Sequence, residues 1–208
     1  MAIKKPILGV VHLGALPHRA GGTDGAGSFD DVYEAALRDA RALAAGGVTG
    51  VILENFGDAP FRKGTADDPV SPDVPAALAV MARAVRLELE VPVGFNCLRI
   101  DGMAALGAAA VAGASWVRVN VLSGACVTDQ GIVEAEAARL AAYRRQLGIE
   151  IVVLADLFVK HAVPLGDVDP VTAAKDLAVR SGADALITTG ARTGEPVDVD
   201  FLDTVKQA

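Results

Sequence analysis

Short runs of apolar, often β-branched residues alternate along the chain with longer Ala- and Leu-rich segments of helical periodicity. The runs predict six strands, at residues 7–13, 50–55, 92–98, 116–122, 150–158 and 185–190. The segments that follow them predict six helices, at residues 30–45, 73–88, 101–111, 133–146, 170–181 and about 198–207. Strict alternation of strands and helices implies a parallel sheet with right-handed crossovers.

Two architectures fit this alternation: a TIM-type barrel and a six-stranded doubly wound sheet. A complete (β/α)8 barrel has eight units and typically about 250 residues, whereas this chain of 208 residues shows six units. A doubly wound sheet normally carries a Gly-rich phosphate turn after its first strand, but Gly21, Gly22 and Gly25 lie well beyond the strand end. We therefore predict an α/β, parallel (β/α)8 TIM-barrel-type domain over residues 1–208 that lacks units seven and eight, as a fragment of a longer chain would.

The composition fits one packed domain and argues against several kinds of partner. Hydrophobic residues make up 52% of the chain, which is enough for a sizeable core. A net charge of −7 without a basic run argues against binding nucleic acid or an anionic membrane through bulk charge. The most apolar window, residues 103–117, is too short to span a bilayer, and residues 1–6 show no signal sequence.

Cysteine usage points to a reducing compartment. The chain has only two cysteines, Cys97 and Cys126, so no disulfide scaffold is implied and we expect a cytoplasmic location. Cys126 has no base near it in the sequence, and we interpret it as a small packing residue.

The stretch from Trp116 to Gly131 breaks the apolar pattern expected of a parallel strand. Side chains alternate in a strand, so Arg118 and Asn120 point away from the side of Val117 and Val119. A parallel strand covered on both faces should be nearly all apolar, and such violations are more often functional than accidental. Polar residues also end the other predicted strands: His12, Glu54, Asn96, Asn120, Asp156 and the pair Thr188-Thr189. Because several strands of a barrel contribute to one site at their carboxyl ends, we predict a small-molecule site there.

Asp156, Lys160 and His161 are candidate catalytic residues. A lysine at a desolvated barrel mouth can act as a base or Schiff-base nucleophile, and a histidine titrates near neutral pH. We assign Asp156 and His161 as a proton-transfer pair and Lys160 as an electrophilic or covalent partner. The alternative is a solvent-facing loop lysine and a histidine that caps a carbonyl group.

His12 and Glu54 complete the catalytic candidates. With Asp156 they can hold a hard divalent cation, but the H-x-H spacing of barrel metallohydrolases is absent. We favour a hydrogen-bonded structural histidine, assign no metal site and leave the cofactor open. Glu54 can also pair with Arg118 across the barrel interior, a structural role that competes evenly with recognition of a substrate carboxylate or phosphate by Arg118.

The remaining candidates lie in loops after the strands. Residues 128–131 (TDQG) precede the predicted fourth helix and either cap its N-terminus or contact a ligand there. Thr189-Gly190 and Thr193-Gly194 resemble a phosphate or carboxylate cradle, although an ordinary glycine turn fits as well. Asp58 and Arg62 lie in a long loop that can close over the site, although we favour a merely solvated loop. The predicted substrate-binding set is Asn55, Asp58, Asn96, Arg118, Asn120, Thr128, Asp129, Gln130, Thr189, Gly190, Thr193 and Gly194.

Four segments carry a resemblance to a known family: residues 54–61 (ENFGDAPF), 120–131 (NVLSGACVTDQG), 155–162 (ADLFVKHA) and 189–196 (TGARTGEP). On these segments the chain resembles the BtpA/SgcQ family, whose members resemble ribulose-phosphate-binding-type barrels. The resemblance covers essentially the whole chain and implies a TIM barrel. Two departures stand out: the chain ends after its sixth unit, where relatives continue, and Phe158 and Ile100 replace residues that we expect to be polar.

Two functions follow as expectations. The first is an enzyme that performs acid–base chemistry on a small polar or phosphorylated metabolite at the carboxyl ends of the strands. The alternative, implied by the resemblance alone, is a non-catalytic photosystem I biogenesis factor that acts through a protein partner. We expect a homo-oligomer that binds a small-molecule ligand, binds no nucleic acid and has no transmembrane segment.

Overall fold

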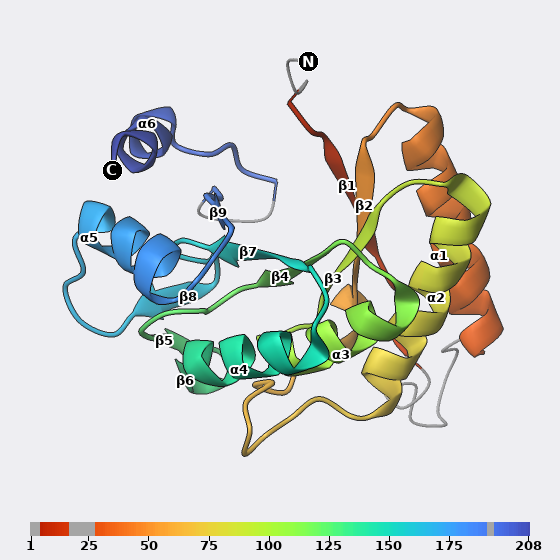
Figure 1. The fold of residues 1–208 in the computed structure, drawn as a ribbon, viewed down its shortest axis with the longest axis horizontal. Helices are drawn as coiled ribbons and strands as arrows, with labels where there is room; N and C mark the ends of the chain where they lie inside the picture. The colour runs from red at the N-terminus through yellow and green to blue at the C-terminus, as the bar shows by residue number, and fades with distance from the viewer. Residues whose placement is uncertain (1–4, 17–27, 191–193) are drawn as a thin grey trace.

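The computed structural model describes residues 5–16, 28–190 and 194–208 (Figure 1). Six parallel strands form one sheet in the order β1-β2-β3-β4-β7-β9, so each strand pairs with the next parallel strand along the chain. Their bounds are Leu8–His12 (β1), Gly50–Glu54 (β2), Val93–Asn96 (β3), Trp116–Val119 (β4), Val152–Asp156 (β7) and Ala185–Ile187 (β9). All six strands predicted from the sequence are present, each within its predicted range.

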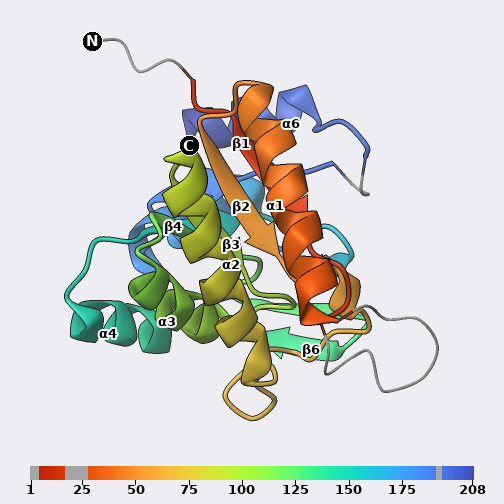
Figure 2. The same cartoon turned by 90° about the vertical axis from the view of Figure 1, so that its right-hand side faces the viewer.

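The helices decide between the two architectures. They are α1 (Phe29–Ala45), α2 (Asp73–Leu89), α3 (Gly102–Ala112), α4 (Ala137–Leu147), α5 (Pro170–Lys175) with the π-helical turn η2 (Asp176–Arg180), and α6 (Val199–Gln207), beside a 3₁₀ turn η1 (Phe56–Asp58). Helices α1 to α4 all lie on the same face of the sheet (Figure 2). A doubly wound sheet carries helices on both faces, so the fold is of the TIM-barrel type. Within the described residues β1 and β9 are the edges of the sheet, which is an open half-barrel.

Capping residues fix where several helices begin and end. Ser28 and Asp31 form a reciprocal capping box before α1, in which Asp31 Oδ2 accepts from the Ser28 amide at 2.7 Å. Gly113, with φ 70°, ends α3 in the left-handed conformation that glycine adopts readily. No helix in the described ranges is both long and apolar enough to cross a membrane.

The two faces of the main sheet differ because side chains alternate along each strand. The side chains that face the helices are buried in the main hydrophobic core: Val11, Val51, Leu53, Val93, Phe95, Val117, Val119, Val153 and Ala155. The inner face, on the other side, carries the polar residues at the carboxyl ends of the strands. A site built there faces the interior of the barrel.

Trp116 covers the inner face below these polar residues. Its indole lies against Gly50 and Gly94 of the two preceding strands, where a methyl group would collide with it. A Cβ on Gly50 would lie 2.4 Å from Trp116 Cη2, and one on Gly94 would lie 1.8 Å from Trp116 Cδ1. The two glycines therefore leave the space that a tryptophan needs on this face.

A second, antiparallel sheet of three strands was not predicted. Its order is β6-β5-β8, with bounds Ala125–Thr128 (β5), Gly131–Glu134 (β6) and Ala162–Pro164 (β8). Cys126 and Val133 of this sheet form a small hydrophobic core with three residues of neighbouring loops. These are Ile100, Val121 and Val159. The packing role predicted for Cys126 agrees with this position.

The prediction that a helix begins near Val133 was wrong. Val133 lies in β6, and α4 begins only at Ala137. Residues 128–131 therefore form the turn of a β-hairpin and do not cap a helix. The sequence signal for the two strands is weak, because each strand is only four residues long.

A candidate active site at the carboxyl ends of the strands

Polar side chains from neighbouring strands form one row across the inner face of the sheet. The strand register places His12 beside Glu54, Glu54 beside Asn96, and Asn96 beside Arg118. Asp156 ends β7, two residues after Leu154, the register partner of Arg118. The structure thus brings together residues that are far apart in the sequence.

Arg118 and Asp156 form the strongest contact in this row. Arg118 Nη2 lies 3.0 Å from both carboxylate oxygens of Asp156, and Nε lies 3.2 and 3.3 Å from them. The Asn120 side-chain amide donates to the same carboxylate. Burial raises the pKa of Asp156, whereas Arg118 and Asn120 oppose that shift. Because the Asp156 side chain is fully covered, the structure does not support the predicted role of Asp156 in a proton-transfer pair.

Glu54 is the buried carboxylate that faces the barrel interior beside this pair. Its Oε2 accepts from Asn96 Nδ2 at 2.6 Å and lies 3.8 Å from Arg118 Nη1. Its Oε1 lies 3.6 Å from His12 Nε2, and the His12 ring stacks on Phe56 at 4.5 Å between ring centroids. The pairing of Glu54 with Arg118 that we predicted is therefore present. At 3.6 Å the contact of His12 with Glu54 is longer than a hydrogen bond, so the hydrogen-bonded structural role favoured for His12 stays a prediction.

The two asparagines of the row are oriented by carboxylates. An ionised carboxylate only accepts hydrogen bonds, so the NH₂ groups of Asn96 and Asn120 must face Glu54 and Asp156. The amide oxygens then point elsewhere, and both are buried without a hydrogen-bond partner among the described residues. A buried acceptor without a partner is costly, so each oxygen can gain from a donor supplied by a bound molecule.

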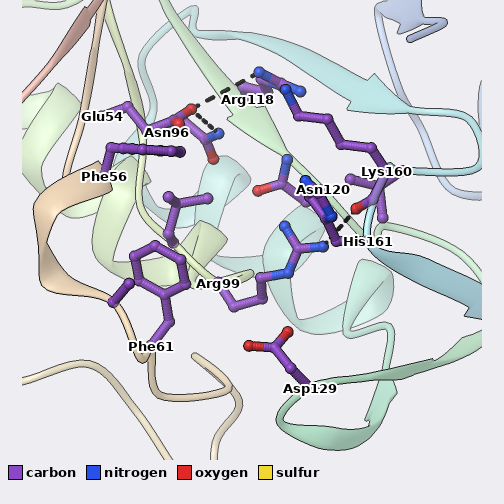
Figure 3. A pocket seen from close by; sticks show the side chains of 13 residues that line it. Glu54, Phe56, Phe61, Asn96, Arg99, Arg118, Asn120, Asp129, Lys160 and His161 are labelled. Carbon is purple, nitrogen blue, oxygen red and sulfur yellow. Dashed lines mark hydrogen bonds and ion pairs between the residues drawn. The ribbon is translucent and has the colours of Figure 1, made fainter. Parts of the chain in front are cut away.

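A cavity of about 370 Å³ opens beside this row (Figure 3). One part of its wall is apolar and includes Phe56, Phe61, Leu98 and Val159. The polar part includes Glu54, Asn96, Arg99, Arg118, Asn120, Asp129, Lys160 and His161. Figure 3 shows Glu54 and Asn96 on one side of the cavity and Lys160 and His161 on the other. The volume suits a small metabolite.

The sequence analysis missed Arg99, which lies in the loop after β3. Its side chain is almost fully buried at the cavity wall, and its Nη2 donates to the Lys160 backbone carbonyl at 2.8 Å. Burial lowers the pKa of the Arg99 guanidinium, and Asp129 and Asp156 oppose that shift. The apolar pair Cys97-Leu98 separates Arg99 from Asn96 at the end of the strand. Arg99 is therefore not a strand-end residue, and the polar strand ends did not indicate it.

Lys160 and His161 come to the cavity from the loop between β7 and β8. Lys160 is half-buried and His161 is exposed, with a left-handed backbone at φ 60°. Both therefore lie at the cavity, as predicted, whereas the Asp156 carboxylate accepts hydrogen bonds from Arg118 and Asn120. A catalytic role for either residue stays a prediction.

Asn55 and Asp58 brace the loop after β2 and do not line this cavity. Asn55 Oδ1 accepts from the Leu98 amide at 2.7 Å, and its Nδ2 donates to Asp58 Oδ2 at 3.0 Å. Asp58 Oδ1 accepts from the Leu16 amide at 2.8 Å. Asp58 is thus buried, contrary to the solvated loop that we favoured, whereas Arg62 is exposed and pairs with Asp68 at 3.3 Å.

The predicted site residues in the hairpin turn have different positions: some form contacts within the turn, and one lines the cavity. Thr128 Oγ1 accepts from the Gln130 amide and donates to the Gly131 carbonyl, so it holds the turn. Gln130 Nε2 donates to Asp129 Oδ2 at 2.6 Å. Of the predicted residues in this turn, Asp129 lines the cavity.

The predicted cradle after β9 does not line the cavity. Gly190 packs against the backbone of Glu195, where an added Cβ would lie 2.3 Å from the carbonyl oxygen. Thr189 Oγ1 is buried without a hydrogen-bond partner among the described residues, and Gly194 lies in the following turn. Thr193 lies outside the described residues. Anion binding by this segment therefore remains a prediction.

The Arg118 guanidinium lies between Glu54 and Asp156, two of the residues that we considered as ligands of a divalent cation. Arg118 contacts both Glu54 and Asp156, so a fixed cation already bridges two of the three residues proposed as mixed ligands. Within the described ranges no group of three or more His, Cys, Asp or Glu side chains is arranged to hold a metal ion.

Comparison with known proteins gives the family. The model of the BtpA family matches residues 3–208. The chain belongs to the BtpA family. This BtpA-family chain is 48% identical over 204 residues to an uncharacterized protein of Thermococcus kodakarensis, covering 98% of the chain and 74% of the relative. It is 43% identical over 203 residues to the photosystem I biogenesis protein BtpA of a Synechocystis strain, covering 98% of the chain and 68% of that relative.

A solved structure supports the fold of this BtpA-family chain. It is the N-acetylmannosamine-6-phosphate 2-epimerase of Clostridium perfringens, which matches with a TM-score of 0.51. The match covers 97% of this chain and 72% of the epimerase at 13% sequence identity. At that identity the likeness concerns the TIM-barrel fold alone.

Proposed function

We propose that this chain is a barrel enzyme that performs acid–base chemistry on a small polar or phosphorylated metabolite. The observation that carries the proposal is the cavity at the carboxyl ends of the strands, where a buried carboxylate faces cationic side chains. These groups come from β2, β4 and the loops after β3 and β7. Convergence from several strands is the arrangement of barrel active sites.

Glu54 is the proton-transfer group in this proposal, in place of Asp156. It lines the cavity, whereas Asp156 is covered and held by Arg118 and Asn120. Arg118, which Asp156 holds in place, lies 3.8 Å from Glu54 Oε2 and helps to fix the position of this carboxylate at the cavity. His161, on the opposite side of the cavity, is placed to exchange a proton with the other end of the reacting group.

The unpaired acceptors of the site favour a hydroxylated substrate. A hydroxyl group can donate to the oxygens of Asn96 and Asn120 after small side-chain adjustments, and a hydrocarbon cannot. The apolar wall formed by Phe56, Phe61 and Leu98 suits the carbon face of such a molecule.

Solvent exchange tests the proposal directly. The chain is incubated in D₂O with small hydroxylated and phosphorylated carbonyl compounds, and deuterium incorporation is measured by NMR and mass spectrometry. We expect incorporation with at least one compound, and a loss of the exchange rate on the order of 10²–10⁴-fold in Glu54→Gln.

This substitution keeps a side-chain acceptor for Asn96, so folding should persist, which thermal unfolding checks. Incorporation at the wild-type rate in Glu54→Gln would remove Glu54 from the mechanism, and no incorporation with any compound would argue against the enzyme.

The second candidate is a role in photosystem I biogenesis. It is favoured by the 43% identity to the Synechocystis protein of that name. The two proposals make different demands on the cavity. In a Synechocystis strain that relies on this chain, a Glu54→Gln and Lys160→Met double variant should still support photosystem I accumulation if the chain acts only through a protein partner. Loss of accumulation with normal protein levels would favour chemistry in the cavity.

A further inference from the structure

The Arg99 guanidinium is a buried cation without a carboxylate partner in the described part of the chain. Only 7% of the residue is exposed, yet no carboxylate oxygen among the described residues lies within 4.0 Å of it. Its hydrogen bond goes to a neutral group, the backbone carbonyl of Lys160. Burial of a charge is unfavourable unless the charge is paired, so this cation is poised to gain a counter-ion.

Lys160 adds a second cation at the same wall. Its side chain lines the cavity, is half-buried, and forms no ion pair with any described residue. The hydrogen bond from Arg99 to the Lys160 carbonyl joins two loops that are 61 residues apart in the sequence. The pair is therefore a built feature in which one cation positions the backbone that carries the other.

No carboxylate among the described residues is close enough to form an ion pair with Arg99 or Lys160. Arg118 is already neutralised by its contacts with Asp156 and Glu54. Asp129 is the acidic residue on the hairpin side of the cavity, but it is exposed and its carboxylate contacts Gln130. Arg99 and Lys160 therefore both line the cavity as cations that form no ion pair with a described carboxylate (Figure 3).

We propose that Arg99 and Lys160 form an oxyanion subsite that binds the phosphate group of the substrate. The inference rests on the proposed function and names its substrate class, a phosphate monoester of a small hydroxylated compound. The planar fork of arginine and the point charge of lysine approach from two loops, which suits a tetrahedral anion with three oxygens better than a planar carboxylate. The subsite lies after β3 and β7, not in the segment after β9 where the sequence suggested a cradle.

The subsite also sets the orientation of the substrate. Figure 3 shows the Arg99 guanidinium away from Glu54, and the Lys160 side chain extending from the opposite side of the cavity toward Arg118. A phosphate held by Arg99 and Lys160 directs the hydroxylated carbon chain toward Asn96 and Glu54. Binding energy from the phosphate then serves to position the reacting carbon at the carboxylate.

Titration with inorganic phosphate tests the subsite without a known substrate. Binding is followed by ³¹P NMR and by the rise in Tm, at constant ionic strength maintained with chloride. We expect saturable binding to the wild-type chain and an increase in Kd of about ten-fold or more in Lys160→Met, because a charged hydrogen bond is lost. The Lys160 side chain forms no ion pair with a described residue, so this variant should fold, which thermal unfolding checks. The matched control is Lys175→Met, an exposed lysine in the last turn of α5, which should bind phosphate like the wild type. Equal Kd values for the wild type and Lys160→Met would overturn the proposal.

Two further measurements keep the outcome clear. Phosphate should protect Lys160 from acetylation in the wild-type chain, with Lys175 unprotected, as measured by mass spectrometry; this arm does not depend on any variant. Acetate at the same concentration should protect Lys160 far less, and equal protection by acetate would replace the phosphate assignment with a carboxylate. Glu54→Gln should bind phosphate like the wild type. If this variant loses proton exchange and still binds phosphate, the loss of exchange is due to Glu54. If the wild type exchanges protons but its phosphate binding does not depend on Lys160, the subsite is overturned and the proposed enzyme is not.

Discussion

Arg118 on β4 and Asp156 on β7 form an ion pair in which both the Nε and Nη2 atoms of the arginine contact both carboxylate oxygens. The arginine side chain is 12% exposed and the aspartate side chain is fully covered. The pair is therefore shielded from water, and its loss should be felt both in stability and in the orientation of Glu54 beside it.

Removal of one partner of this pair should destabilise the fold strongly. Asp156→Ala leaves a buried guanidinium with only the more distant Glu54, and we expect a loss of about 3–5 kcal/mol in the free energy of unfolding, measured by urea denaturation. Asp176→Ala, which breaks an exposed pair with Arg180, should cost less than about 1 kcal/mol. The double variant Arg118→Met and Asp156→Leu should cost less than the sum of its single variants, and additive losses would show that the pair is not coupled.

The fit of Trp116 over Gly50 can be tested by a double-mutant cycle. Gly50→Ala brings a Cβ to within 2.4 Å of the indole and should destabilise the chain by about 1–3 kcal/mol. The colliding atoms belong to side chains, Trp116 and Leu8, so the strain should shrink in a Trp116→Leu background. Thermal unfolding of the four proteins gives the coupling energy. An equal cost of Gly50→Ala in both backgrounds would mean that the indole does not limit the space.

Cys97 should make stability depend on alkaline pH. Burial, and then the nearby Asp101 and Asp58, raise the pKa of the thiol well above its ordinary value in the folded chain. In the unfolded chain the thiol ionises near pH 8.5, a typical value. Above about pH 8.5 the unfolded state loses a proton that the folded state keeps, so the free energy of unfolding should fall as pH rises, by at most about 1.4 kcal/mol per pH unit. Urea midpoints between pH 7 and 10 should show a shallower fall in Cys97→Ala, and identical slopes would contradict the shift.

Substitutions at the neighbouring positions 132 and 133 of β6 should differ strongly in their effect on stability. Val133 is fully buried in the small core, so Val133→Ala should cost roughly 1–3 kcal/mol and weaken hydrogen-exchange protection in β5 and β8. Ile132 is exposed on the other face, and Ile132→Thr should change stability by no more than about 0.5 kcal/mol. Equal losses of stability in the two variants would contradict the alternation of buried and exposed side chains in β6.

The parallel sheet could be predicted from the sequence because its signals are local. Each strand is a short apolar run, each helix has an apolar period, and glycine C-caps such as Gly113 mark the joins. The polar ends of four strands were also visible, since Glu54, Asn96, Asn120 and Asp156 interrupt apolar stretches. The β5–β6 hairpin was missed because four-residue strands carry little periodicity and owe their stability to packing against Ile100, Val121 and Val159.

The sequence by itself thus determined the order of strands and helices, the barrel class of the sheet and the face on which polar groups gather. It did not determine which polar groups contact one another. Only the tertiary structure showed that Asp156 is enclosed by Arg118 and Asn120 and that Arg99 reaches the backbone of Lys160. The physical reason is distance along the chain: alternation and periodicity fix the direction of a side chain relative to its own neighbours, whereas burial and ion pairing depend on segments that meet only after the sheet curves.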